Sequence, residues 1–306
     1  MDTLKKVLVF IPAFNEEESI ESVIQQVSNL FPEEKTRSKG FFIQLLIVND
    51  GSTDQTEEIA KSKGIKVISH PRNLGLGAAT RTGMANAFEA GADIAIKLDA
   101  DLQHDPADIE NVILPILENK ADICWGSRIT GEITYRMPMI RKYGNRFFTW
   151  LMNQLTCYTI SDAQTGMMAF GRKYLSIFEI HGNYNPPQQL LIDAHSKFMR
   201  YMEVPVTFYP RKTGKSFISL KYPLIVVLNI IRVIIYANPL RVFSICGLTL
   251  IGFSVGYLLL SKATQSFGWD LSFLFLKSLG LVTMILGVQT IFFGILADLI
   301  IKKRSK

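Results

Sequence analysis

An acidic segment carries the clearest chemical signal in this sequence of 306 residues. It reads Asp99-Ala100-Asp101-Leu102-Gln103-His104-Asp105 and follows an apolar run at residues 94–98. Two carboxylates spaced two positions apart beyond a strand end can converge on one hard cation, which takes oxygen ligands from side chains and from a diphosphate together. The sequence therefore predicts that Asp99 and Asp101 bind a divalent metal. The alternative is that Asp101 and Asp105 only cap the helix that begins at Pro106. Capping explains Asp105 well but does not explain Asp99, whose charge would be costly next to an apolar strand.

Two further polar segments offer groups for binding a nucleotide. Pro12-Ala13-Phe14-Asn15-Glu16-Glu17 follows an apolar run at residues 7–11, and Asn49-Asp50-Gly51-Ser52-Thr53-Asp54 follows another at residues 45–48. The second segment combines carboxylates with a tight turn, which suits hydrogen bonding to a base and a ribose. An Asx turn with a helix cap explains its last three residues equally well, and the first segment reads equally as an ordinary helix entry.

These polar segments need a scaffold that brings their strand ends together. Short apolar runs alternate with helical patterns along the first part of the chain. The predicted strands are 7–11, 45–48, 67–69, 94–98 and 123–125, and the predicted helices are 17–30, 57–63, 75–91 and 106–119. This alternation predicts an α/β fold with a doubly wound, mostly parallel sheet, whose ligands gather beyond the carboxyl ends of the strands.

The C-terminal part of the chain has a different composition. Apolar stretches at residues 240–260 and 271–301 are each long enough for a membrane helix of about 20 residues, so we expect a two-helix transmembrane hairpin. Cations flank its outer ends and only Lys262 lies in the connection, which predicts cytoplasmic termini and a cytoplasmic catalytic domain. The start of the chain lacks the pattern of a signal peptide. The apolar segment at residues 223–237 contains a polar and a basic residue, so an interfacial amphipathic helix is favoured over a third span.

These patterns divide the chain into a catalytic domain at residues 1–221, an interfacial region at 222–239, and the hairpin with a basic tail at 240–306. The formal net charge is +6, but the basic residues do not form the runs that are typical of nucleic-acid binding. We therefore expect a lipid bilayer and phosphate-bearing molecules as partners, and no nucleic acid. The oligomeric state is left open, a homo-oligomer included.

Taken together, the polar segments resemble glycosyltransferase family 2. Their order and spacing match those of its GT-A fold, and they cover nearly the whole expected catalytic domain. The resemblance implies a UDP- or GDP-linked sugar donor and a Mg²⁺ or Mn²⁺ ion held by Asp99, Asp101 and Gln103. Asn49 departs from the family, which commonly has Asp at this position. A contact from residue 49 to the nucleotide base would therefore lack the negative charge of a carboxylate. The nucleotide-binding residues that the resemblance implies are Pro12, Ala13, Asn15, Glu16, Asp50, Ser52, Asp54, Asn73, Gly75, Asp99 and Ala100.

Later segments are similar to the polyprenyl-phosphate branch of that family, which dolichol-phosphate mannose synthase typifies. They are Gly126-Ser127-Arg128, residues 141–145, residues 211–216, and Asn238-Pro239-Leu240-Arg241 at the start of the hairpin. In that branch basic residues hold the donor diphosphate and the lipid phosphate, and guanidinium groups match phosphate geometry. A solvated or membrane-facing helix side explains the basic residues near position 141 as well. The residues implied for phosphate and acceptor binding are Arg128, Arg141, Asn145, Arg211 and Lys215.

Asp162 is a further carboxylate of interest, in Ser161-Asp162-Ala163-Gln164-Thr165-Gly166. A positioned Asp can serve as the general base that many inverting sugar transferases need. A lipid monophosphate is already anionic near neutral pH, so Asp162 would then orient sugar or phosphate contacts, and a simple turn beside Gly166 explains it equally well. The predicted catalytic residues are Asp99, Asp101, Asp162 and Arg128.

The sequence as a whole predicts an inverting, metal-dependent transfer of a sugar from a nucleotide sugar to a dolichyl or undecaprenyl phosphate. Transfer to another membrane lipid, such as diacylglycerol, is an alternative of the same class. A catalytically silent membrane scaffold that binds nucleotide sugars is the alternative from a different class. The sequence has no Gln-x-x-Arg-Trp segment, which argues against a processive polysaccharide synthase.

Overall fold

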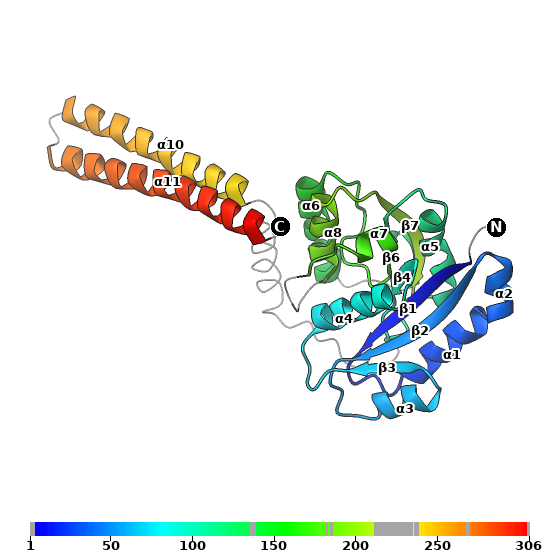
Figure 1. The fold of residues 1–306 in the computed structure, drawn as a ribbon. Coiled ribbons are helices and arrows are strands. Elements are labelled where there is room, and N and C mark those ends of the chain that lie inside the picture. The colour runs from blue at the N-terminus through cyan, green and yellow to red at the C-terminus, as the bar shows by residue number, and fades with distance from the viewer. Residues whose placement is uncertain are drawn as a thin grey trace. The chain divides into compact units, whose positions relative to one another are not determined.

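The computed structural model describes residues 4–134, 139–180, 183, 186–210, 235, 239–266 and 270–304. They belong to two compact units, Met1–Asn229 and Ile230–Lys306 (Figure 1). The expected interfacial region at residues 222–239 lies outside the described residues except at positions 235 and 239. The three-part division of the chain therefore stays a prediction.

The first unit is built around one mixed sheet. Its seven strands follow the order β3-β2-β1-β4-β6-β5-β7. Strands β1 to β4 run parallel to one another and β5 runs parallel to β7, whereas β6 is antiparallel to both of its neighbours. The expectation of a mostly parallel sheet is confirmed. The strands are β1 (Lys5–Ala13), β2 (Phe41–Asn49), β3 (Lys66–Ser69), β4 (Ile94–Lys97), β5 (Ile123–Ile133), β6 (Met168–Gly171) and β7 (Tyr201–Phe208).

Helices connect these strands. The predicted helix at residues 106–119 begins as a short 3-10 turn, η1 (Pro106–Asp108). The Ala107 N–H donates to Asp105 Oδ1 at 2.9 Å, so Asp105 is the cap that the sequence suggested. The helices of this unit among the described residues are α1 (Ile20–Leu30), α2 (Glu33–Ser38), α3 (Thr56–Ser62), α4 (Leu76–Glu89), α5 (Ile109–Leu117), α6 (Met139–Thr156), α7 (Arg172–Leu175) and α8 (Pro186–Ser196).

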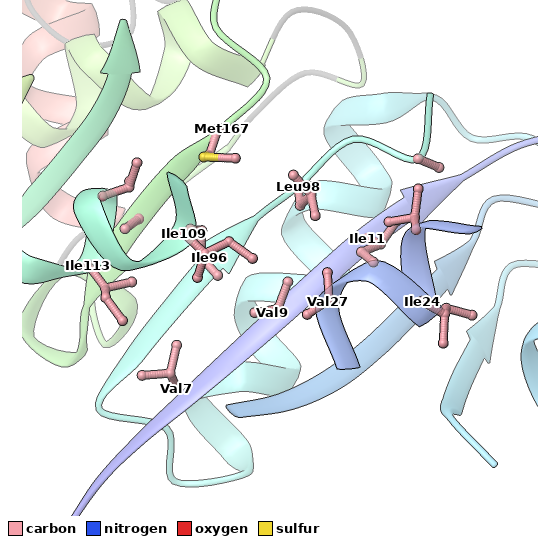
Figure 2. Close-up of a cluster of buried hydrophobic side chains, with 14 of the residues drawn as sticks. Val7, Val9, Ile11, Ile24, Val27, Ile96, Leu98, Ile109, Ile113 and Met167 are labelled. Atoms are coloured by element: carbon pink, nitrogen blue, oxygen red, sulfur yellow. The ribbon is translucent and has the colours of Figure 1, made fainter. Parts of the chain in front are cut away.

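Strand β1, an interior strand of the sheet, is buried on both faces. Alternate side chains of β1 point into a cluster that α1 and α5 complete on one face (Figure 2). On the other face α4 lies so close that a Cβ at Gly83 would be 2.2 Å from Phe10 Cδ2. Burial on both faces explains why β1 reads as a continuous apolar run. The labelled members of the cluster are Val7, Val9, Ile11, Ile24, Val27, Ile96, Leu98, Ile109, Ile113 and Met167.

The second unit is a hairpin of two long helices, α10 (Pro239–Ser266) and α11 (Asp270–Arg304). Each contains a stretch long and apolar enough to cross a membrane, as the sequence predicts. Small residues recur every seven positions along the contact, which lets the two backbones approach closely. Ser254 Oγ donates to the Gly280 carbonyl oxygen at 2.6 Å. These small residues are Gly247, Ser254 and Ser261 on α10, and Gly280, Gly287 and Gly294 on α11.

Gly287→Leu is expected to destabilise this hairpin, because a Cβ at position 287 would lie 2.8 Å from the Gly247 carbonyl oxygen. Overpacking of this kind costs about 1–3 kcal/mol. The measurement is the thermal unfolding midpoint of the purified protein in detergent. Gly252→Leu is the matched control, since nothing lies within 4 Å of a Cβ built at that position. Equal midpoints for the two variants would contradict the close contact.

Candidate active site at the carboxyl end of the sheet

The carboxyl ends of β1, β2 and β4 lie side by side, because these strands are parallel neighbours. β1 and β2 pair as far as Ala13, and the Asp50 N–H then donates to the Ala13 carbonyl oxygen at 2.8 Å. On the other side of β1, the Leu98 N–H continues the pairing at 3.1 Å, which places Asp99 just beyond the same edge. The three polar segments found in the sequence therefore meet at one edge of the sheet.

The loops after β1 and β2 are joined by hydrogen bonds. The Asn15 N–H donates to Ser52 Oγ at 3.0 Å, and the Thr53 N–H donates to Asn15 Oδ1 at 2.8 Å. The Glu17 N–H donates to Asp54 Oδ2 at 3.2 Å. Asn15 has a φ of 53°, in the left-handed region that Asn tolerates better than most residues. Ser52 and Asp54, both predicted to bind the nucleotide, thus use their side chains to hold the two loops together.

The loop after β2 includes, at Asp54, the Asx turn that the sequence left open as an alternative. The Ser52 N–H donates to Asn49 Oδ1 at 3.0 Å, and Asp54 Oδ1 accepts the Thr56 N–H at 3.0 Å where α3 begins. Asn49 also donates through Nδ2 to Glu57 Oε2 at 2.8 Å. An aspartate in its place would set two carboxylates against each other, so the amide suits this chain. The departure from the family at position 49 therefore has a local structural reason.

Asp50 is a buried carboxylate that organises the loop at residues 73–75. It accepts the Leu74 N–H at 3.0 Å and the Gly75 N–H at 2.8 Å, and its Oδ1 lies 2.7 Å from His70 Nδ1. Gly75 has a φ of 97°, and a Cβ there would lie 2.6 Å from the Asn183 carbonyl oxygen, so glycine is required. The loop that contains Asn73 and Gly75 is in this way tied to the end of β2.

Asp99 is paired with a buried lysine that the sequence analysis missed. The Lys97 side chain is 1% exposed, and its Nζ donates to Asp99 Oδ1 and, at 3.1 Å, to the Gly166 carbonyl oxygen. A buried ammonium group is costly unless it is paired and hydrogen-bonded, and these two oxygens provide both. The available signal was a single charged residue inside the apolar run at residues 94–98.

Asp101 and Gln103 complete the oxygen donors of the acidic segment. Leu102 between them has a φ of 58°, and the Gln103 N–H donates to Asp101 Oδ1 at 3.1 Å. The buried Gln103 amide donates through Nε2 to the Tyr209 carbonyl oxygen at 3.3 Å, so Oε1 is the atom it could offer to a cation. The described residues contain no group of three or more His, Cys, Asp or Glu side chains placed to hold a metal. Two carboxylates and one amide suit Mg²⁺ or Mn²⁺ when the remaining ligands come from a diphosphate and water.

His104 lies buried next to these donors. Its ring packs edge-on against Phe208, with the ring centroids 4.9 Å apart. Burial lowers the pKa of His104 to about 4, so the ring is neutral at pH 7. Among the described residues its Nδ1 has no hydrogen-bond partner. His104 therefore adds bulk but no charge to the site.

Gly166 leaves room for the Asp99 carboxylate. A Cβ at this position would lie 2.0 Å from Asp99 Oδ2 and 2.8 Å from His104 Nε2. Gly166→Ala is therefore expected to displace Asp99 and to lower kcat for sugar transfer about 10²-fold. The measurement is the initial rate at saturating donor, with the thermal midpoint as a check on folding. Gly144→Ala is the control and should keep the wild-type rate, because nothing lies within 4 Å of a Cβ built at that position. An unchanged rate for Gly166→Ala would show that the position of the Asp99 carboxylate does not depend on the space at Gly166.

Arg128 and Asp162 form a buried ion pair. The Phe208 ring packs against both Arg128 and His104. Arg128 Nε donates to Asp162 Oδ2 at 2.6 Å, and Arg128 Nη2 donates to Asp162 Oδ1 at 2.8 Å. Asn145 of α6 donates to the same Oδ1 at 3.0 Å. The guanidinium group lies over the Phe208 ring, 4.9 Å from its centroid. The structure therefore brings together three residues that the sequence predicts for catalysis and phosphate binding.

The surroundings of Asp162 determine its protonation. Its side chain is fully buried, which taken alone raises the pKa of a carboxyl group. Hydrogen bonds and charge from Arg128, together with backbone N–H groups, outweigh burial and hold the pKa of Asp162 below its ordinary value. Asp162 is therefore ionised at neutral pH and bound at both oxygens. These surroundings do not favour a general base, whose pKa should lie near the working pH.

Three of the predicted phosphate-binding residues have no described side chain. Arg141 lies on α6, but its side chain is outside the described residues, and Arg211 and Lys215 lie outside them altogether. Their roles stay predictions. The sequence analysis in turn missed the contributions of Phe208 and Tyr209, because no strand was expected near residues 201–208.

Known proteins similar to this chain belong to the family that its polar segments resemble. The model of glycosyl transferase family 2 matches residues 8–178. A UDP-N-acetylglucosamine--dolichyl-phosphate N-acetylglucosaminyltransferase of Methanococcus voltae is 32% identical over 223 residues, which cover 66% of this chain and 85% of that protein. A dolichol-phosphate mannosyltransferase of Pyrococcus furiosus is 29% identical over 264 residues, which cover 83% of this chain and 71% of that protein.

A solved structure shows that the fold is also shared. Glucosyl-3-phosphoglycerate synthase from Mycobacterium tuberculosis, in complex with Mn²⁺, UDP-glucose and phosphoglyceric acid, matches with a TM-score of 0.58. The match has 22% sequence identity and covers 75% of this chain and 80% of that one. Because the family model covers more than half of the 306 residues, the chain belongs to glycosyltransferase family 2.

Proposed function

We propose that this chain is a membrane-anchored enzyme that transfers a sugar, with inversion, from a UDP- or GDP-linked donor to a dolichyl or undecaprenyl phosphate. The relatives in Methanococcus and Pyrococcus are named for transfer involving dolichyl phosphate. The two apolar helices α10 and α11 would provide the anchor. Cations outside the hairpin favour a cytoplasmic catalytic domain and cytoplasmic termini.

The choice of acceptor rests on one observation, the buried ion pair that Asp162 forms with Arg128. A hydroxyl acceptor, such as that of diacylglycerol, needs a base to remove its proton. Asp162 is the carboxylate that the sequence offers for this task, yet it is fully buried and held by Arg128 at both oxygens. A phosphate monoester is already anionic and can attack without a base. The ion pair therefore supports a phosphate acceptor over a hydroxyl acceptor.

The site would work by positioning and charge. Asp99, Asp101 and Gln103 would hold the divalent metal, which when bound neutralises the departing nucleoside diphosphate. The loops at residues 12–17 and 49–54, joined by hydrogen bonds, would receive the nucleotide without further ordering. Lys97 fixes the Asp99 carboxylate. A phosphate oxygen of the acceptor would then attack the anomeric carbon in line with the leaving diphosphate.

The proposal is tested by supplying both substrates. The purified full-length protein is incubated with a panel of UDP- and GDP-linked sugars and a radiolabelled polyprenyl phosphate in the presence of Mn²⁺. The expected result is a lipid-linked monosaccharide from one donor. Product with diacylglycerol alone would overturn the acceptor, and binding of a donor without any lipid-linked product would indicate a silent scaffold.

Removal of the metal gives a further expected result. Excess EDTA should reduce transfer to background, and an excess of Mg²⁺ or Mn²⁺ over EDTA should restore it, because the oxygen donors suit a hard cation. Calorimetric titration with Mn²⁺ and the nucleoside diphosphate supplies a readout that does not depend on turnover. Full transfer in saturating chelator would contradict the role of Asp99, Asp101 and Gln103.

A further inference from the structure

Strand β7 carries a half-buried carboxylate, that of Glu203, which the proposed reaction does not use. In the parallel register of β5 and β7, Glu203 is the partner of Trp125. Side chains two positions apart on a strand point to the same face of a sheet. Ser127, two positions after Trp125, therefore shares a face with Glu203. This places the Glu203 carboxylate on the side of β5 to which the neighbour of Arg128 points.

The Glu203 carboxylate binds the backbone of the turn that contains Asp162. The Ser161 N–H donates to both carboxylate oxygens, at 3.0 and 2.9 Å, and the Asp162 N–H donates to Oε1 at 3.2 Å. The Ser161 hydroxyl donates to Oε2 at 2.6 Å, and the Tyr201 hydroxyl donates to Oε1 at 2.6 Å. One side chain of β7 thus holds two successive backbone N–H groups of this turn.

A pair of hydroxyl groups extends these contacts to β5. Ser161 Oγ lies 2.6 Å from Ser127 Oγ. A carboxylate only accepts hydrogen bonds, so the Ser161 hydroxyl donates to Glu203 and the Ser127 hydroxyl is left to donate to Ser161 Oγ. Ser127 is fully buried, and its Oγ also accepts the Thr130 N–H at 3.3 Å. The hydrogen bonds therefore run in one direction, from β5 through the turn to Glu203.

Both members of the buried ion pair are sequence neighbours of the residues that Glu203 holds. Asp162 follows Ser161 along the chain, and Arg128 follows Ser127. The Arg128 N–H also donates to Asp162 Oδ2 at 3.1 Å. A shift of either backbone segment would therefore move the guanidinium group of Arg128.

Tyr201 is held so that its hydroxyl faces Glu203. Its ring stacks on Tyr158, with the ring centroids 4.8 Å apart, and lies edge-on to Trp125 at 5.8 Å. Burial, and after it the charge of Glu203, raise the pKa of Tyr201 above its ordinary value, so the hydroxyl stays protonated and donates. The hydroxyl and N–H groups that donate to Glu203 are all neutral. Glu203 thus holds the turn without competing with Asp162 for the charge of Arg128.

We propose that Glu203 is a positioning residue for sugar transfer, which holds the backbone on both sides of the Arg128–Asp162 pair and thereby directs Arg128 at a substrate phosphate. An anionic side chain repels a phosphate, so Glu203 acts through the backbone and not as a ligand. Misplacement of a group at the reacting atoms by about 1 Å can cost about 10²-fold in rate. The inference rests on the proposed function, because it requires that Arg128 contacts a phosphate.

Substitutions of Glu203 test the proposal through kcat/KM for transfer by the full-length protein. Glu203→Leu should lower kcat/KM about 10²-fold. Glu203→Gln should retain most of it, because the amide oxygen can accept both N–H groups and the amide nitrogen can donate to Ser161 Oγ. Tyr201→Phe is the matched control, since it removes a bond to Glu203 that does not reach the turn, and it should keep the wild-type rate. Wild-type kcat/KM in Glu203→Leu, or a similar loss in all three variants, would refute the proposal.

A double-mutant cycle separates positioning from a general loss of stability. Arg128→Lys keeps a cation next to Asp162 but loses the planar fork that matches a phosphate. If Glu203 acts through Arg128, Glu203→Leu should cost much less in the Arg128→Lys background than in the wild type, since residues that act together show non-additive effects. Ser161→Ala supplies a milder variant for the same cycle, because it keeps both N–H bonds to Glu203, and we expect about a fivefold loss. Additive losses in both cycles would mean that Glu203 has a structural role only.

Hydrogen exchange measured by mass spectrometry tests the contact without turnover. In Glu203→Leu the N–H groups of Ser161 and Asp162 lose their acceptor, so a peptide covering residues 159–167 should exchange faster while β1 is unchanged. Unchanged exchange at residues 159–167, or an equal increase in β1, would contradict the positioning role. Wild-type protein that transfers sugar to no lipid would instead contradict the proposed function, and the exchange would still decide whether Glu203 holds this turn.

Discussion

Asp101→Asn is expected to lower the rate of sugar transfer about 10³-fold while the protein stays folded. The substitution preserves the shape of the side chain, which accepts the Gln103 N–H at 3.1 Å, but removes the charge that would bind a cation. Asp99→Asn should act in the same direction and also removes the negative charge that Lys97 pairs with. The measurement is kcat/KM over a range of Mn²⁺ concentrations, together with Mn²⁺ affinity by calorimetry.

Asp105→Asn is the matched control for these two variants. Asp105 caps η1 and accepts the Tyr209 hydroxyl at 2.9 Å, and asparagine is an equally good capping residue. It should therefore retain both transfer and stability. Wild-type activity in Asp101→Asn and Asp99→Asn would mean that the acidic segment holds no catalytic metal.

Arg128→Met is expected to lower the free energy of unfolding by about 3–5 kcal/mol, because it leaves the Asp162 carboxylate buried without its cation. The Asp162 side chain is fully buried and that of Arg128 is 12% exposed, so solvent can compensate only a little. Transfer should be lost as well, since Arg128 is a predicted phosphate ligand. Urea unfolding monitored by circular dichroism measures the first effect, and the transfer assay measures the second.

The double variant Arg128→Met/Asp162→Asn separates these two effects. Removing both charges of a buried pair costs much less than removing one, so most of the lost stability should return. Transfer should not return if Arg128 contacts phosphate. Recovery of transfer together with stability would show instead that the pair is only structural.

Acid should weaken the wild-type protein through the same pair. The pKa of Asp162 is held below its ordinary value of 3.8, so the unfolded chain binds this proton more readily than the folded one. The stabilising contribution is thus complete above the ordinary value and is lost as the pH falls through the lower, folded value. The double variant should lack this part of the acid dependence.

Several elements could be predicted from the sequence because their signals are local. β1 and β2 contain the continuous apolar runs 7–11 and 45–48, and β4 is apolar except for Lys97, because these residues lie mostly buried between the two faces of the sheet. The acidic segment could be placed at the sheet edge because parallel strands end together there. α10 and α11 could be predicted from the length and apolarity of two stretches.

Other features have no local signal. β6 (Met168–Gly171) is four residues long and antiparallel, and only its neighbours β4 and β5 make it a strand. Ser52 and Asp54 have residue types that suit both a nucleotide contact and a turn. Their bonds to the Asn15 and Glu17 N–H groups became known only once two separate loops were brought together.

The sequence by itself determined the family, the α/β alternation, the acidic segment at Asp99 and Asp101, and the two apolar helices. Only the tertiary structure decided which charged groups pair, Lys97 with Asp99 and Arg128 with Asp162. It also decided that Gly166 lies next to the Asp99 carboxylate. The reason is physical. Apolar periodicity and residue type are properties of neighbouring positions, whereas the pairing of a buried charge depends on which distant segments the folded sheet brings within hydrogen-bonding distance.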